Sequence, residues 1–133
     1  MTHFGIDSAA LLIVVERHLS IAPGHSLVAP NRILSDLLGT LLADVRNGAR
    51  TEKAALELHT RATETKIRLL GDRVSRRTAW NLAIELGCDL RDAECLAVTK
   101  LQADAPITTD AHLATLAAGI VPVIEVETLT AKR

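Results

Sequence analysis

The sequence predicts a single α/β domain covering residues 1–133, in which helices sandwich a parallel sheet in three layers. Short apolar segments that suit strands alternate with longer segments of helical periodicity, and the joining loops are short, which is typical of parallel sheets covered on both faces. The composition is 48% hydrophobic but only 2% aromatic, so Leu, Ala, Val and Ile must build the core. A chain of this length fits one compact domain.

The N-terminal third predicts two strands and two helices. Residues 3–7, HFGID, form a predicted strand that ends at Asp7, and Ser8 opens a helix that extends to residue 20. Apolar residues cover most sides of this helix, which indicates deep burial. Residues 26–30, SLVAP, predict a short strand or an entry segment. Asn31 then suits the N-cap of a helix that Gly48 ends.

The rest of the chain continues the alternation. Thr51 and Asp89 are good N-cap residues for two of the predicted helices, and Gly87 separates the second of these from the helix before it. The predicted helices cover residues 51–65, 74–86, 90–102 and 111–117, and the predicted extended segments cover residues 66–71, 106–108 and 121–126.

Several aspartates stand where either capping or chemistry would use them. Asp7 and Asp110 follow predicted strands, and parallel sheets bind ligands outside the carboxyl ends of their strands. Asp7, Asp89 and Asp110 also lie within a residue of a helix start, where a carboxylate caps backbone N–H groups. Asp92 suits the first turn of its helix, and Asp36 points roughly 150° away from the apolar stripe of its own helix. Both interpretations therefore stay open.

Three segments together resemble a known family. They are GIDSAALL at residues 5–12, LVAPNRILSDLLGTLL at 27–42, and AWNLAIELGCDLRDAECLAVTKLQADAPITTDAHLA at 79–114. In order and spacing they resemble the PIN domain of VapC-type toxins, the toxins of type II toxin-antitoxin systems. This resemblance implies a parallel sheet between helices, metal-dependent cleavage of RNA, a small VapB-like antitoxin as protein partner, and a homodimer.

The resemblance also implies site residues. It places the catalytic acids at Asp7, Asp36, Asp92 and Asp110, with Asp7, Asp92 and Asp110 on the metal and Asp36 orienting a water or a second ion. Ser8, Thr108 and Thr109 would give polar support. The second acid of such domains is commonly a glutamate, whereas this chain has Asp36, and Asp44 is a poorer substitute. An all-oxygen set of ligands favours Mg²⁺ or Mn²⁺.

The charge is unevenly distributed along the chain. Residues 46–77 contain nine Arg or Lys and four Asp or Glu, while the chain as a whole has a formal net charge of -1. Such a segment suits either a solvated helix face or a track for RNA phosphates, which would be bound without reading the base sequence. Under the second interpretation the candidate RNA contacts are Arg68, Arg73, Arg76, Arg77 and Arg91.

Cysteine usage and hydropathy suggest a cytoplasmic protein. Cys88 and Cys95 have neither CxxC spacing nor a His partner at metal-ligand spacing, so we expect reduced, buried thiols. The longest apolar run, residues 9–15, is far shorter than the roughly 20 residues of a membrane helix, so we expect no membrane association.

Three functions compete at this stage. The first is a Mg²⁺- or Mn²⁺-dependent endoribonuclease that serves as the toxin of a toxin-antitoxin pair. The second is a PIN-like fold without catalysis, acting as a binding or scaffold module. The third is a housekeeping PIN nuclease without an antitoxin.

Overall fold

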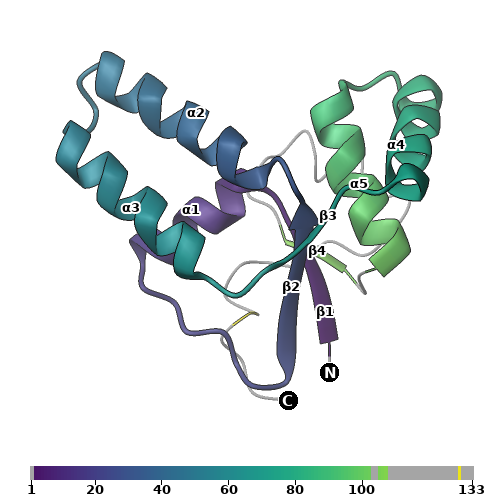
Figure 1. The fold of residues 1–133 in the computed structure, drawn as a ribbon, viewed down its shortest axis with the longest axis horizontal. Helices are drawn as coiled ribbons and strands as arrows, with labels where there is room; N and C mark the ends of the chain where they lie inside the picture. Colours follow the sequence, from purple (N-terminus) through teal and green to yellow (C-terminus); the bar gives the residue numbers. More distant parts are fainter. Residues whose placement is uncertain (1, 103–104, 108–128, 130–133) are drawn as a thin grey trace.

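The strands form one parallel sheet. The computed structural model describes residues 2–102, 105–107 and 129, and within them the strands are β1 (Thr2–Ile6), β2 (His25–Pro30), β3 (Arg68–Leu70) and β4 (Ala105–Ile107). Their order across the sheet is β3-β2-β1-β4, and every neighbouring pair is parallel (Figure 1). The predicted parallel sheet is therefore confirmed.

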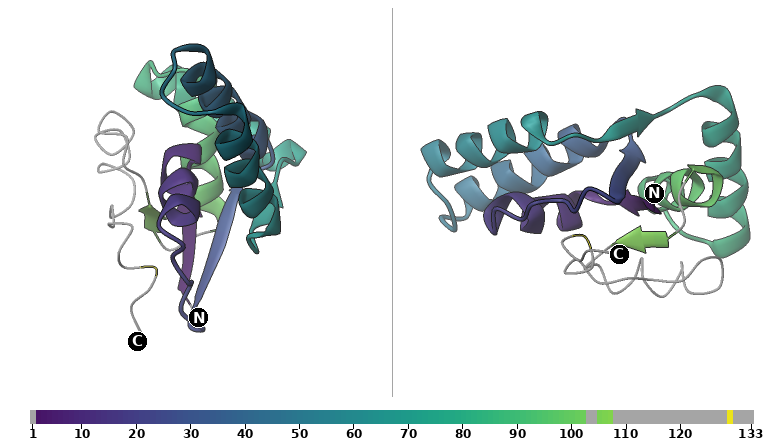
Figure 2. Two further views of the ribbon diagram at one scale, coloured as in Figure 1. Left: turned by 90° about the vertical axis from the view of Figure 1, so that its left-hand side faces the viewer. Right: turned by 90° about the horizontal axis from the view of Figure 1, so that it is seen from below.

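Helices cover both faces of this sheet. Figures 1 and 2 show α1 (Ser8–Glu16), α2 (Ile33–Arg46) and α3 (Glu52–Glu64) on one side, and α4 (Arg73–Leu86) and α5 (Leu90–Gln102) on the other. Helix α5 packs on β1 and β2, and α4 packs on α5. The arrangement confirms a three-layer α/β fold.

Alternation along β1 separates the two helical layers. Phe4 and Ile6 belong to the main core, which they share with Leu11 of α1 and Leu37 of α2. Gly5, between them, faces α5 and comes so close that an added Cβ would lie well inside contact distance of the Thr99 hydroxyl. Since successive strand residues point to opposite faces, a side chain at position 5 would push α5 off the sheet.

Most predicted helix ends are confirmed. The carboxylate of Asp7 accepts a hydrogen bond from the Ala10 N–H at 2.8 Å, and Asp89 accepts one from the Asp92 N–H at 3.0 Å. The Thr51 hydroxyl caps α3 in the same way. Gly87 ends α4 in the left-handed conformation, with a φ of 65°, which glycine adopts without strain.

The predicted end of α1 and the predicted N-cap of α2 are wrong. Helix α1 stops at Glu16 rather than at residue 20, and His18 takes a left-handed φ of 51° in the turn that follows. Asn31 is not the N-cap of α2, because Arg32 holds that position without a capping side-chain bond. The Asn31 N–H instead donates to the Leu70 carbonyl at 2.9 Å, so Asn31 extends the contact between β2 and β3.

The last predicted elements are only partly covered. The strand predicted at residues 106–108 is β4, Ala105–Ile107, one residue earlier. Thr108, Thr109 and Asp110, the helix predicted at residues 111–117 and the strand predicted at 121–126 lie outside the described residues.

The packing of α5 on β1 predicts opposite results for two glycines. Gly5→Ala should destabilise the protein by about 1–3 kcal/mol, because the new methyl group collides with Thr99. Gly39→Ala, in the exposed interior of α2 with nothing within 4 Å of the new Cβ, should raise stability by roughly 0.5–1 kcal/mol. Urea unfolding of both variants measures the difference, and equal stabilities would contradict the close approach.

Candidate functional site

Three aspartates line one small pocket at the carboxyl end of β1. The pocket has a volume of about 170 Å³, and Asp7 and Asp92 are each only 7% exposed. The Asp36 side chain is 16% exposed. We call this the acidic pocket, and its lining residues are Asp7, Ser8, Ala9, Pro30, Ile33, Asp36, Thr40, Arg91, Asp92 and Cys95.

Each of these acids comes from a different element that starts or ends at this edge. Asp7 directly follows β1 and caps α1. Asp36 lies in the first turn of α2, just beyond the end of β2, and Asp92 lies in the first turn of α5. The helices that follow β1 and β2 begin at the carboxyl edge of the sheet, and α5 also begins there because it leads back to the start of the parallel strand β4, so the connectivity gathers these first turns.

Cys95 shows how negative this pocket is. Burial strongly raises the pKa of its thiol, and the charges of Asp7, Asp92, Asp36 and Glu94 raise that pKa further. All four carboxylates therefore act on one point at the pocket wall. The structure brings together Asp7, Asp36 and Asp92, as predicted. Glu94 was not predicted from the sequence.

An arginine links two of the acids across the layers. The Arg32 Nε lies 3.2 Å from an oxygen of Asp36, and its Nη1 lies 3.6 Å from Glu94 on α5. The Arg32 side chain is 40% exposed, so these ion pairs add only about 0–1 kcal/mol of stability each. The ion pairs matter for geometry, because they hold Asp36 at the pocket and connect α2 to α5.

A second pocket adjoins the acidic one. Its volume is about 340 Å³, and it shares Pro30 and Asp36 with the acidic pocket. Two arginines from different elements, Arg32 and Arg76, stand in its wall, and we therefore call it the arginine pocket. Its lining residues are Pro30, Asn31, Arg32, Ser35, Asp36, Leu70, Gly71, Ser75, Arg76, Glu94 and Val98.

The described residues hold part of the predicted metal site. Among residues 2–102, 105–107 and 129, no three His, Cys, Asp or Glu side chains are gathered in a way that could hold a metal ion. Asp110, the third predicted ligand, is outside this set. Strand β4 does pair with β1, with Ile107 beside Ile6, so these two strands end together at the edge that carries Asp7.

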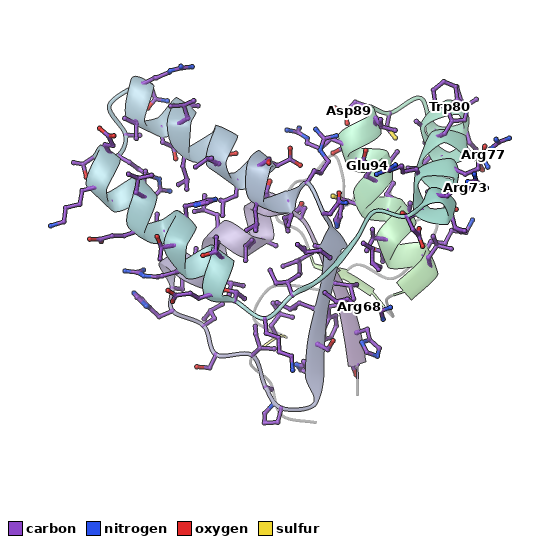
Figure 3. All side chains as sticks on the ribbon, viewed as in Figure 1. Arg68, Arg73, Arg77, Trp80, Asp89 and Glu94 are labelled. Carbon is purple, nitrogen blue, oxygen red and sulfur yellow. The ribbon has the colours of Figure 1, made fainter. Side chains whose placement is uncertain are left out.

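The predicted RNA contacts divide into two groups. Arg76 lines the arginine pocket and Arg91 lines the acidic pocket. Arg73 and Arg77 instead lie on the outer side of α4, which faces away from α5, beside the 59% exposed Trp80 (Figure 3). Arg68 is an exposed residue of β3 and lines neither pocket.

Asp44, the poorer substitute for Asp36, has a structural partner. It accepts a hydrogen bond from Arg50 at 2.8 Å, and Arg50 also lies 2.6 Å from Glu16. These bonds raise the pKa of Arg50, with Asp44 the larger cause. Asp44 therefore joins the far end of α2 to α1 and does not line the acidic pocket.

Comparisons with known proteins support the fold. No family model and no curated protein matches the chain. Among solved structures, the crystal structure of PAE2754 from Pyrobaculum aerophilum is similar, with a TM-score of 0.72, 21% sequence identity, and coverage of 98% of this chain and 93% of that one. At this identity the likeness shows the shared α/β architecture.

None of the helices in the described part of the chain is long and apolar enough to cross a membrane.

The acidic pocket predicts an order of thiol reactivity. At pH 8, N-ethylmaleimide should label Cys95 at least about tenfold more slowly than Cys88, because the thiolate is the reactive form and a pKa raised by one unit reduces it tenfold. Burial raises the pKa of both thiols; two carboxylates, Asp92 and Asp89, also raise that of Cys88, whereas four act on Cys95, which is the more strongly shifted thiol. Peptide mapping by mass spectrometry measures the two rates, and the urea-unfolded protein, in which they should converge, is the control. Faster labelling of Cys95 would contradict the charge assigned to this pocket.

Proposed function

We propose that the protein is a metal-dependent endoribonuclease of the PIN type, which hydrolyses RNA phosphodiester bonds with Mg²⁺ or Mn²⁺. The observation that carries the proposal is the convergence of Asp7, Asp36 and Asp92, from three separate elements, on one small pocket at the carboxyl edge of a parallel sheet. Ligand sites of open α/β sheets occur at this edge. Three carboxylates in one pocket repel one another unless a cation or a proton relieves the charge.

The donor set fits a hard divalent cation. Mg²⁺ takes one or two carboxylates directly and keeps several waters, so it does not need three protein ligands. Asp7 and Asp92 are the buried acids that would hold the ion or its waters, and the resemblance to PIN domains implies Asp110 as the third. Asp36, restrained by Arg32, would orient a water. When bound, the cation would make a water more acidic and stabilise charge on the phosphoryl oxygens.

The toxin role rests on the resemblance to VapC proteins. It adds a small VapB-like antitoxin and a homodimer to the proposal, and it makes an RNA of the host cell the substrate. A PIN-like scaffold without catalysis is the competing function. One observation favours it, namely that no three His, Cys, Asp or Glu side chains among the described residues are placed so that together they could hold a metal ion.

Cleavage assays with two matched variants test the enzyme proposal. Wild type should cut a mixed RNA substrate only with Mg²⁺ or Mn²⁺, and Asp7→Asn should lose at least about 100-fold in rate. Asn is as good an N-cap as Asp, so the start of α1 should stay intact while the charge is lost. Asp89→Asn makes the same change at a helix cap that lines neither pocket, and it should cut like wild type.

The outcomes separate the candidate functions. Equal loss in both variants would indicate a general defect rather than a role for the Asp7 charge. Folded wild-type protein that cuts no RNA with either ion would leave the binding module as the better function.

Expression in cells tests the toxin part of the proposal. The wild-type chain should arrest growth by cutting RNA, whereas Asp7→Asn, produced in equal amount, should not. Arrest that persists in Asp7→Asn would disprove a nuclease origin. Cleavage in vitro without any arrest would instead favour a housekeeping PIN nuclease.

A further inference from the structure

The arginine pocket lies directly beside the proposed catalytic pocket, and its chemistry differs. The acidic pocket has three aspartates and one arginine in its wall, whereas the arginine pocket has two arginines and two acids. Asp36 belongs to both walls, so the two pockets adjoin. A cation suits the first pocket, and an anion suits the second only if its acids are already neutralised.

Arg32 offsets one of these two negative charges and bridges both acids. It pairs with both acids of the arginine pocket, Asp36 and Glu94, at 3.2 and 3.6 Å. Figure 3 shows Glu94 on α5. Within the described part of the chain, Arg76 makes no ion pair with the acids of this pocket, and its charge acts on Asp72, the exposed N-cap residue of α4. Arg32 and Arg76 together offset the two acids, so the pocket is formally neutral, and Arg76, in the first turn of α4, is the guanidinium that is not bonded to those acids.

Neutral hydrogen-bonding groups complete the wall. Asn31, Ser35 and Ser75 line the same pocket. The Asn31 amide lies so close to Gly71 that a Cβ at position 71 would have to displace it. The Ser75 hydroxyl donates to the Asp72 carbonyl at 3.1 Å, so it stands oriented as an acceptor. A phosphate with its ribose carries acceptors and hydroxyl donors that match these groups.

We propose that the arginine pocket is the subsite for the nucleotide next to the scissile phosphate, with its phosphate on Arg76 and its ribose beside Asn31 and Ser75. This inference rests on the proposed nuclease function and deepens it. At about 340 Å³ the pocket is near the lower end of ligand pockets, about 300–1,000 Å³, which suits one nucleotide of a single strand. Arg76 is then a binding residue, and Arg77, on the outer side of α4, is not.

Binding of a single-stranded RNA tests the subsite. A fluorescein-labelled RNA of twelve nucleotides is titrated, with Mg²⁺ present, into the Asp7→Asn protein, which should bind without cutting. Adding Arg76→Gln should weaken binding about tenfold and lower the slope of log affinity against log salt by roughly 0.7, because one phosphate contact to a single strand is lost. Adding Arg77→Gln, the neighbouring arginine outside the pocket, should change affinity less than twofold.

The results distinguish failure of the proposed subsite from failure of the proposed nuclease function. Circular dichroism of all variants checks that α4 stays folded. Equal effects of Arg76→Gln and Arg77→Gln, in a protein whose wild type cuts RNA, would overturn the subsite and leave the nuclease intact. No RNA binding by any variant, together with no cleavage by wild type, would overturn both proposals.

Discussion

The close approach of α5 to β1 determines where the candidate site forms. Gly5 leaves room for Thr99, whose buried hydroxyl donates to the Cys95 carbonyl at 3.0 Å and so has a partner inside its own helix. Because α5 leads into the parallel strand β4, it runs opposite to β1. Its first turn, which carries Asp92, therefore lies over the end of β1, where Asp7 begins α1. A larger side chain at position 5 would separate the two acids.

Among the described residues, one arginine bridges two acids at this edge. Arg32 holds Asp36 and Glu94, which come from opposite helical layers, while Asp7 and Asp92 line the acidic pocket beside it. Because Arg32 is partly exposed, its ion pairs are weak in water, and a bound cation or phosphate competes with them at little cost. Ion pairs of this kind suit a site in which a bound cation or phosphate changes the local charge.

The sequence predicts the strands, the layers and the positions of the acids better than it predicts which residues form ion pairs at the site. Strand alternation and helix caps are local patterns, so Asp7 and Asp92 were found at the right ends of the right elements. Arg32 and Asp36 have the i, i+4 spacing of a helical ion pair, a signal that was available. Glu94 gave no such signal, because its pairing depends on how α2 and α5 lie across the sheet. Arg76 and Arg77 look alike in the sequence, and only the placement of α4 separates them.

An aspartate at a helix start can cap the helix and also take part in binding or catalysis. A carboxylate has two oxygens with about four lone-pair sites, and the cap of α1 uses one bond from the Ala10 N–H to Asp7. That bond fixes the direction of the Asp7 side chain, which a metal ligand or a base also requires. Asp89 makes the same cap on α5 yet lines neither pocket. What distinguishes Asp7 is therefore its position, since the helix that it caps begins where β1 ends and where two other first turns converge.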